Sequence, residues 1–449
     1  MRILWLCNIM LPAFARAEGL PYSNREGWLS GIFDRLQAEQ KVYRENGEQD
    51  VLLNMDLGVC FPAPGELGDC RREHGGVVFY GFQEDLTHPE SYDPSLELRF
   101  ADVLSDFRPD VVHIFGTEFP HALAMIRAFR DPAHTLVGIQ GLCCSIADCY
   151  MADLPYSVRR AATFRDRVRK DSLRQQQHKF RLRARTEAKI LSGAGHITGR
   201  TEFDREITGE LAPESVYHTM NETLRSDFYT GQWDPAETEP YSIFLSQGDY
   251  PLKGFHYMLE AMPSILEVFP DARLYVAGNS LIGGVGGRIR ARRRAPRPLW
   301  ITAYGRYLLQ LIRRYHLGGH VVMLGRLDAQ QMKEQYLRSN VFVCASAVEN
   351  SPNSLGEAML LGLPCVAAKV GGIPDLLSDG EDGILFPGGK SDELAEGIKT
   401  IFYDAELAQM LGMHARRTAR VTHNPDTNFK RLLSIYRSMM GQPRTVEVL

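Results

Sequence analysis

Short runs of apolar residues, bounded by turn-forming residues, alternate along most of the chain with longer segments of mixed polarity. Runs this short and this apolar are typical of parallel strands that are buried on both faces of a sheet. We predict strands at Arg2–Cys7, Asp50–Asn54, Gly76–Tyr80, Val111–Phe115, Thr135–Ile139, Ser242–Ser246, Arg273–Ala277, Val321–Leu324, Val341–Cys344 and Pro364–Ala367.

Segments with helical spacing of apolar residues lie between many of these runs. We predict helices at Leu29–Glu45, Phe119–Phe129, Gly254–Phe269 and Asp328–Arg338. The alternation of strand and helix predicts open α/β sheets, and 449 residues are enough for two or three domains.

One stretch interrupts the alternation. Residues 232–240 are polar, contain Pro235 and Pro240, and have no periodicity, which indicates a linker. We predict one Rossmann-like domain over residues 1–230 and a second over residues 231–420. A last helix, within residues 421–449, is expected to pack back toward the first domain.

Composition excludes two classes of protein. The eight cysteines form no Cys-x-x-Cys pair, so we expect reduced thiols in a cytoplasmic protein rather than a disulfide scaffold. No stretch reaches about 18 uncharged apolar residues, so no membrane-spanning helix is predicted. The net charge of -4 points to no particular partner.

The local charge is more informative. Residues 159–189 contain twelve Lys/Arg and three Asp/Glu. One interpretation is a long helix whose basic face lies in water. The other is a cationic surface for anionic lipid headgroups, which would place the protein peripherally on the inner face of the cell membrane. Nucleic acid is not expected as a partner, because no nucleic-acid motif is present.

The candidate chemistry lies between residues 341 and 387. A predicted strand ends before Glu349, and a helix begins near Asn353, Ser354 and Leu355. Ligands of open α/β sheets bind at this carboxyl end of the strands, and the free amide groups of a first helical turn bind phosphate. We therefore expect Asn353, Ser354 and Leu355 to hold a diphosphate, with Glu357 on a ribose and Glu349 on an attached sugar.

The order of motifs here resembles the retaining glycosyltransferases of family 4. Glu349 and Glu357 are eight positions apart, and Gly362-Leu363-Pro364 and Gly371-Gly372 follow them. The resemblance implies a GT-B fold, in which two Rossmann-like domains with parallel sheets face each other across a deep cleft. It also suggests a member of the capsular or exopolysaccharide type.

The resemblance extends upstream to the segment Ser246–Gly254. In the family, a lysine of this loop contacts the donor diphosphate, so Lys253 inherits that role. The family usually has an arginine just before this lysine, but Gln247 and Gly248 stand there. Arg326 and Arg200 are the candidates to replace it, and for each the alternative is an arginine at the surface.

Further candidates lie in the first half of the chain. Gly27 lies in a segment that resembles the family's glycine-bearing loop after the first strand, and the resemblance implies that it lets the backbone approach the donor phosphates. Glu118 and Gln140 follow later strands and are expected to face the acceptor; many family members have a histidine where Gln140 stands. The sequence favours His113 as a core histidine rather than a site residue.

The resemblance implies transfer of a hexose from a UDP- or GDP-sugar to a hydroxyl of a carbohydrate or a lipid-linked sugar, in polysaccharide or glycolipid biosynthesis. It implies retention of anomeric configuration with no metal and no further cofactor. Glu349 and Lys253 would act in catalysis, and the leaving diphosphate would deprotonate the acceptor. The sequence agrees in having neither an Asp-x-Asp motif nor a His/Cys cluster with ligand spacing.

Two alternatives stay open. A sugar-nucleotide epimerase of the same architecture would convert the donor without an acceptor, and a catalytically weak protein would only bind nucleotide sugars. A nicotinamide oxidoreductase is disfavoured, because the glycines at 283–287 do not have the spacing of a dinucleotide-binding motif.

Overall fold

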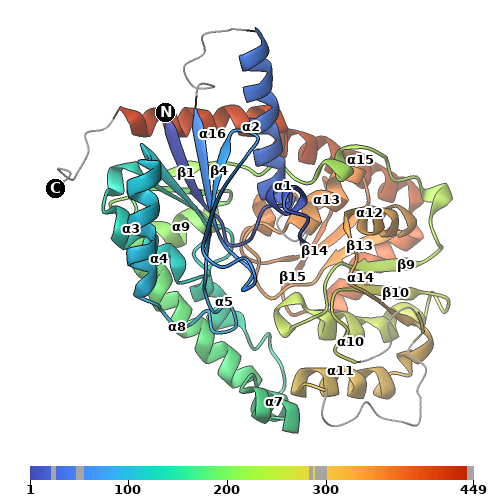
Figure 1. The fold of residues 1–449 in the computed structure, drawn as a ribbon. Helices are drawn as coiled ribbons and strands as arrows, with labels where there is room; N and C mark the ends of the chain where they lie inside the picture. Colours follow the sequence, from blue (N-terminus) through green and yellow to red (C-terminus); the bar gives the residue numbers. More distant parts are fainter. Residues whose placement is uncertain (22–26, 47–54, 283–286, 289–300, 442–449) are drawn as a thin grey trace. The chain divides into compact units, whose positions relative to one another are not determined.

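The structure is a computed structural model that describes residues 1–21, 27–46, 55–282, 287–288 and 301–441. It divides into two compact units (Figure 1). The first contains residues 1–144, 179–225 and 423–449, and the second contains residues 145–178 and 226–422. The sequence prediction placed residues 145–178 in the first domain. They cluster instead with the second unit, because their contacts are made to helices of that unit.

The first unit contains an eight-stranded sheet in the order β3-β4-β2-β1-β5-β6-β7-β8, counted over the described residues. Its strands are β1 (Arg2–Leu6), β2 (Asp56–Pro62), β3 (Cys70–His74), β4 (Val77–Phe82), β5 (Val111–Phe115), β6 (Thr135–Gly138), β7 (His196–Gly199) and β8 (Val216–Thr219). Its helices include α1 (Pro12–Ala17), α2 (Gly27–Asn46), α3 (Ser95–Phe107), α4 (His121–Phe129), α9 (Glu202–Leu211), α16 (Pro425–Met440) and most of α8 (Leu173–Ser192).

The central strand β1 explains why this sheet is covered on both faces. Successive side chains of a strand point to opposite faces. Ile3 and Trp5 lie in one apolar cluster with side chains of α1, α2 and α16. Leu4 and Leu6 lie in a second cluster with side chains of α3, α4 and the end of α8. A strand that is buried on both sides must be apolar along its buried part, and β1 is apolar from Ile3 to Leu6.

The second unit contains a seven-stranded sheet in the order β11-β12-β10-β9-β13-β14-β15, again over the described residues. Its strands are β9 (Ser242–Leu245), β10 (Arg273–Ala277), β11 (Gly287–Arg288), β12 (Val321–Gly325), β13 (Val341–Cys344), β14 (Cys365–Lys369) and β15 (Ile384–Pro387). Its helices are α6 (Tyr156–Arg160), α7 (Phe164–Arg169), α10 (Phe255–Leu266), α11 (Ala303–Arg314), α12 (Ala329–Arg338), α13 (Asn353–Leu361), α14 (Ser391–Tyr403) and α15 (Ala405–Thr422). Helix α10 packs beside α11 and α14, and α13 packs beside α15.

Most predicted strands and helices are confirmed with small shifts of their ends. The strands Val111–Phe115, Arg273–Ala277 and Val341–Cys344 agree at both ends. The edge strands β3 and β11 pair antiparallel with their neighbours, so the parallel pattern holds for the remaining strands. The strand predicted at Asp50–Asn54 lies outside the described residues.

Helix α16 is fixed to the first sheet by the hydroxyl group of Tyr436. The indole Nε1 of Trp5 donates to this oxygen at 2.9 Å, and the oxygen lies 2.7 Å from Nδ1 of His113. Burial lowers the pKa of His113 to about 3, so its ring is neutral at physiological pH. The interpretation of His113 as a core histidine is therefore confirmed, and its role is to bind a helix from the far end of the chain.

Replacing Tyr436 by phenylalanine tests this anchor. Tyr436→Phe leaves two buried polar groups without their partner, which is expected to lower the free energy of unfolding by about 1–3 kcal/mol. The measurement is urea denaturation, with a lower midpoint at an unchanged m-value. The matched control is Tyr403→Phe at a tyrosine that is 67% exposed, which should cost less than about 0.5 kcal/mol. Equal costs for the two substitutions would contradict the anchor.

Candidate functional site

The candidate site of the second unit lies at the carboxyl edge of its sheet. Strand β9 is the centre of the sheet, with β10 and β12 on one side and β13 and β14 on the other. The chain order reverses between β9 and β13, which is where open α/β sheets bind ligands. Lys253 follows β9, Arg326 follows β12, and Glu349 follows β13.

Two glycines let the loops at this edge touch one another. Gly254 follows Lys253 and has a φ of +69°, and a Cβ atom there would lie 1.8 Å from the carbonyl oxygen of Ala345. Gly371, in the loop after β14, has a φ of +52°, and its Cβ would lie 2.0 Å from the carbonyl oxygen of Glu349. That oxygen accepts a hydrogen bond from the amide of Gly372 at 3.0 Å. The loops after β9, β13 and β14 are thus held together by their backbones.

Lys253 and Glu349 form an ion pair between two of these loops. Nζ of Lys253 lies 2.5 Å from Oε1 of Glu349, and the hydroxyl group of Ser346 donates to the same oxygen at 2.6 Å. Burial by itself would lower the pKa of Lys253, but the carboxylate of Glu349 together with the nearby Tyr250 and Cys344 outweighs burial and raises this pKa above its ordinary value. The lysine is therefore a cation, and about a fifth of its side chain is exposed (22%). The structure brings together the two residues that the sequence predicted for catalysis.

Ser346 was missed by the sequence analysis. It lies three residues before Glu349, at the end of the predicted strand, where its spacing gives no helical or strand signal. Its bond to Oε1 holds the carboxylate independently of Lys253.

Helix α13 begins four residues after Glu349. Its N-cap is Pro352, and no side chain caps it. The amide of Leu355 donates to the carbonyl oxygen of Pro352 at 3.0 Å, so in this structure it is already used within the turn. Asn353 and Ser354 are partly exposed in the first turn. The positive end of the helix dipole therefore lies in the same loop as the ion pair.

Glu357 lies one turn further along α13 and is 4% exposed. Its Oε2 is 3.5 Å from the hydroxyl group of Tyr336, which also donates to the carbonyl oxygen of Ser354 at 3.0 Å. Tyr336 of α12 thus supports both the first turn of α13 and the carboxylate predicted to bind a ribose.

Arg326 belongs to a chain of polar contacts across three strand ends. Its Nε donates to Oδ1 of Asn279 at 2.7 Å, and Nδ2 of Asn279 donates to Oδ2 of Asp249 at 2.8 Å. Asn279 follows β10 and Asp249 follows β9, and the sequence analysis identified neither. The chain orients the guanidinium group of Arg326, which is otherwise exposed at this edge.

Arg200 and Gln140 lie in the first unit, where both contact Glu222. The guanidinium of Arg200 is 2.6 Å from Oε2 of Glu222, and Nε2 of Gln140 donates to Oε1 at 2.9 Å. The side chains of Arg200 and Glu222 are each 4% exposed. Arg200 also donates to the carbonyl oxygens of Ile139 and Gln140. In this structure Arg200 thus neutralises a buried carboxylate, and its role toward the donor stays a prediction.

Glu118 follows β5 at the carboxyl edge of the first sheet. Nδ2 of Asn8 donates to its Oε2 at 3.3 Å, and the amide oxygen of Asn8 lies 2.9 Å from Nε2 of His121. Nδ1 of His121 in turn lies 2.6 Å from Oε2 of Glu84. Asn8 directly follows the first predicted strand, so its position could have been found from the sequence, whereas the buried partners Glu84 and His121 could not.

Gly27 is the first residue of α2, and residues 22–26 before it lie outside the described part of the chain. Within the described residues, no group of three or more His, Cys, Asp or Glu side chains is arranged to hold a metal ion. None of the helices described is both long enough and apolar enough to cross a membrane.

Comparison with known proteins finds a family model that matches most of the second unit. Residues 226–418 match the family model described as glycosyl transferases group 1. The chain is 30% identical over 173 residues to a phosphatidyl-myo-inositol mannosyltransferase of Mycobacterium leprae, which is 37% of this chain and 38% of that protein. Across eight curated relatives, the aligned part spans between 28% and 62% of their length.

Solved structures resemble the whole chain. Sucrose-phosphate synthase from Thermosynechococcus elongatus matches with a TM-score of 0.67 at 17% identity, covering 98% of this chain and 99% of that one. Anabaena Alr3699/HepE, solved in complex with UDP-glucose, matches with a TM-score of 0.64 at 16% identity, covering 98% and 100%. The chain therefore has the GT-B fold, and its residues 226–418 match the family model of the glycosyl transferases of group 1.

Proposed function

We propose that this protein is a retaining, metal-independent glycosyltransferase that moves a hexose from a nucleotide diphosphate sugar to a hydroxyl group. The observation that carries the proposal is the Lys253–Glu349 ion pair, which lies in the same group of loops as the uncapped N-terminus of α13. A cation, a helix dipole and a carboxylate at the carboxyl edge of a sheet are what a diphosphate with an attached sugar requires.

Each part of the donor has a candidate partner. The ammonium group of Lys253 and the first turn of α13, at Asn353 and Ser354, would bind the diphosphate. Glu357 would accept hydrogen bonds from the ribose, and the exposed guanidinium of Arg326 would face the nucleobase. The complex of HepE with UDP-glucose supports a uridine donor, with a guanosine donor as the alternative.

The ion pair suggests how donor binding prepares the reaction. A diphosphate competes with Glu349 for the ammonium group of Lys253, because both are anions. When Lys253 turns to the phosphates, Ser346 still holds the Glu349 carboxylate in place. Glu349 is then free to stabilise positive charge that develops on the transferred sugar, while Lys253 stabilises the negative charge of the leaving diphosphate. The diphosphate itself would take the proton of the acceptor hydroxyl.

The acceptor is proposed to be a carbohydrate or a lipid-linked sugar in polysaccharide or glycolipid synthesis, of the capsular or exopolysaccharide type. Glu118 and Gln140, at strand ends of the first sheet, are its candidate contacts. The mannosyltransferase relative, whose name specifies a phosphatidyl-inositol, supports a lipid-bearing acceptor. A cytoplasmic enzyme that works peripherally at the membrane through residues 159–189 fits such an acceptor.

The competing function is a sugar-nucleotide epimerase. It differs from a transferase in needing no acceptor, so incubation of the protein with UDP- and GDP-hexoses alone separates the two. The transferase leaves the sugar intact until an acceptor is added, whereas an epimerase produces a new nucleotide sugar.

Removing the negative charge of Glu349 is expected to abolish most of the transfer. Glu349→Gln keeps the shape of the side chain, and we expect kcat to fall by about 100-fold or more, because the carboxylate acts on charge that develops in the transition state. The measurement is release of nucleoside diphosphate in the presence of an acceptor, with circular dichroism to check the fold. The control is Glu406→Gln, an exposed glutamate of α15, which should leave kcat unchanged. Full activity of Glu349→Gln would contradict the assignment.

Lys253 is expected to determine the affinity for the diphosphate. Lys253→Met keeps the apolar length of the side chain, and binding of UDP should weaken by about tenfold or more, because an ion–phosphate contact is lost. Isothermal titration calorimetry measures it. Lys390→Met, at an exposed lysine before α14, is the control and should leave the affinity unchanged. If both variants bind UDP as the unaltered protein does, Lys253 is not in the donor site.

A further inference from the structure

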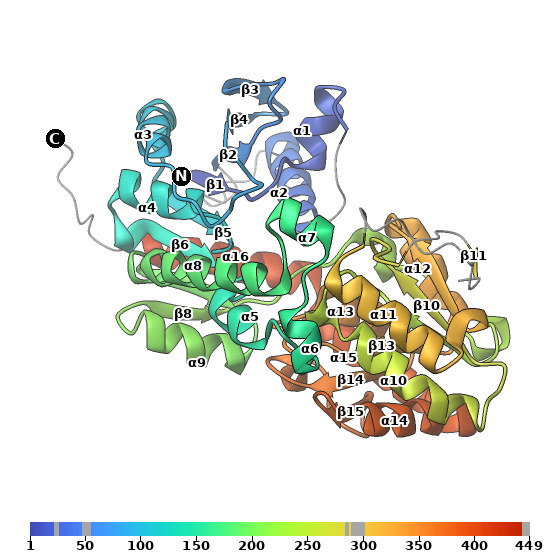
Figure 2. The same cartoon turned by 90° about the horizontal axis from the view of Figure 1, so that it is seen from below.

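Residues 145–178 leave the first sheet after β6 and cluster with the second unit. The carbonyl oxygen of Ala152 lies 2.9 Å from Nε2 of His256 in α10, and the hydroxyl group of Tyr257 donates to Oδ2 of Asp153 at 3.1 Å. Helix α6 lies beside α11 (Figure 2). The segment that contains the short helices α6 and α7 therefore packs against helices of the second unit.

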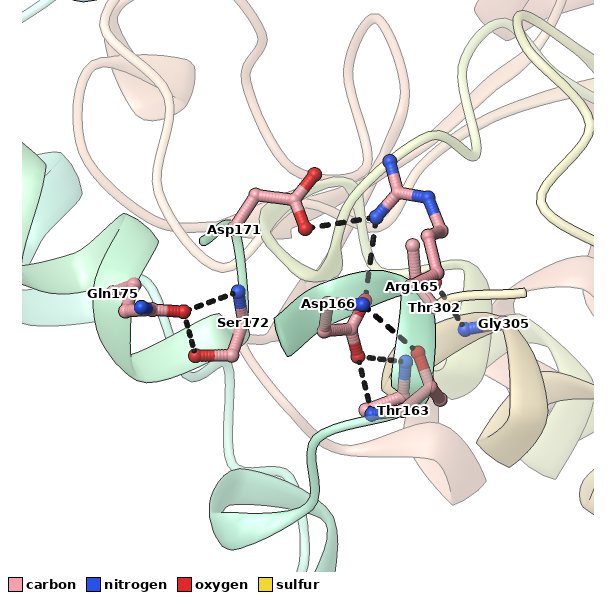
Figure 3. Close-up of polar contacts among 9 residues, drawn as sticks. Thr163, Arg165, Asp166, Asp171, Ser172, Gln175, Thr302 and Gly305 are labelled. Atoms are coloured by element: carbon pink, nitrogen blue, oxygen red, sulfur yellow. Dashed lines mark hydrogen bonds and ion pairs between the residues drawn. The ribbon is translucent and has the colours of Figure 1, made fainter. Parts of the chain in front are cut away.

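Asp166 attaches α7 to α11. Its Oδ2 accepts from the amide of Thr163 and from the amide of Ala303, both at 2.9 Å, so one buried carboxylate serves two helix N-termini. The amide of Asp166 donates in return to the hydroxyl group of Thr163 at 3.2 Å. Figure 3 shows this arrangement, with Thr302 capping α11 through the amide of Gly305. The orientation of α7 is fixed by these bonds.

The fixed orientation leaves three large apolar side chains in solvent. Tyr156 is 66% exposed, Phe164 is 59% exposed and Val168 is 65% exposed. Phe164 and Val168 are four residues apart, so they lie on the same face of α7. Single exposed apolar residues are ordinary, but three large ones within thirteen residues, two of them on one face of a helix, are a concentration that calls for a partner.

Basic residues are frequent in the same stretch of the chain. Residues 156–174 contain seven Lys/Arg and two Asp. Both acidic side chains are already engaged, because Arg165 lies 3.2 Å from Oδ1 of Asp166 and 2.9 Å from Oδ1 of Asp171 (Figure 3). The exposed cations that remain are Arg159, Arg160, Arg167, Arg169, Lys170 and Arg174. Arg160 lies over the ring of Tyr156, at 5.2 Å from its centroid.

The other half of the basic segment differs in its contacts. Lys179 forms an ion pair with Glu90 at 3.0 Å, and Nε of Arg183 donates to the carbonyl oxygen of Glu118 at 2.8 Å. The guanidinium of Arg183 also covers the ring of Phe180 at 4.5 Å. Lys179 and Arg183 thus serve the first unit. Arg181, Arg185 and Lys189 are exposed, but residues 175–189 include no exposed large apolar side chain, so we restrict the proposed membrane-binding surface to residues 156–174.

We propose that residues 156–174, the α6–α7 anchor, bind the surface of a bilayer that contains anionic lipids. Tyr156, Phe164 and Val168 enter the headgroup region, and the surrounding arginines and Lys170 bind lipid phosphates. Aromatic rings flanked by long basic side chains are typical of membrane interfaces, and the aliphatic Val168 beside Phe164 can enter the apolar part of a bilayer but cannot stack on a base. This surface is where the enzyme would meet a lipid-linked acceptor, and that part of the proposal rests on the proposed function.

Vesicle sedimentation tests the anchor with the full chain and without any nucleotide sugar. The vesicles are phosphatidylcholine alone, or phosphatidylcholine with about 30% phosphatidylglycerol. We expect binding to the anionic vesicles to be at least about tenfold tighter, and to weaken as salt is raised. Phe164→Ser with Val168→Ser should weaken it about tenfold, and so should Arg167→Gln with Arg169→Gln and Lys170→Gln.

The matched control carries Met413→Ser and Val421→Ser on α15, where the side chains are 60% and 73% exposed. It should bind the anionic vesicles as the unaltered protein does. UDP binding and thermal melting of the same samples should be unchanged in every variant, which separates a failed anchor from a failed donor site.

Three results would overturn the anchor. The first is no binding of the unaltered protein to anionic vesicles, including the case in which it binds heparin or single-stranded RNA instead. The second is equal binding to both kinds of vesicle. The third is equal loss of binding in the control and in the anchor variants.

Discussion

The candidate donor site depends on the close contact of three loops at the carboxyl edge of the second sheet. The contact is made by backbone atoms, and it exists because Gly254 and Gly371 have no Cβ and adopt a positive φ. Any other residue at Gly254 would collide with the carbonyl oxygen of Ala345, 1.8 Å away. The positions of Lys253 and Glu349 follow from this contact, since each lies beside one of the touching backbones.

The electrostatics of the site follow from the same geometry. Two opposite charges that are partly withdrawn from water stabilise each other, and Ser346 gives the carboxylate a second partner. The site therefore keeps its charged groups in place before a donor arrives, which is the form of preorganisation that favours stabilisation of a transition state. The first unit uses its charges differently, because Arg200 and Glu222 neutralise each other within its interior.

The alternation of apolar runs was enough to predict the fold class, because strands buried on both faces must be apolar throughout. The same reasoning missed β8 (Val216–Thr219), whose residues are exposed or half-buried at the sheet edge. In the site, Lys253 was predicted from the resemblance to the family's loop, and Glu349 from its place at a strand end together with the family's order of motifs. Ser346, Asn279 and the partners of Asn8 (His121 and Glu84) were not, because each acts through a contact between residues distant in sequence or through a bond without a repeating pattern. The clustering of residues 145–178 with the second unit likewise depends on hydrogen bonds between residues far apart in sequence, such as the bond from the amide of Ala303 to Asp166.

A crystal structure of the protein with UDP tests the central claim most directly. The account predicts that the diphosphate binds against the first turn of α13, with Nζ of Lys253 moved from the carboxylate of Glu349 to a phosphate oxygen and with Ser346 still bonded to that carboxylate. A nucleotide bound elsewhere, with the Lys253–Glu349 pair unchanged, would contradict it.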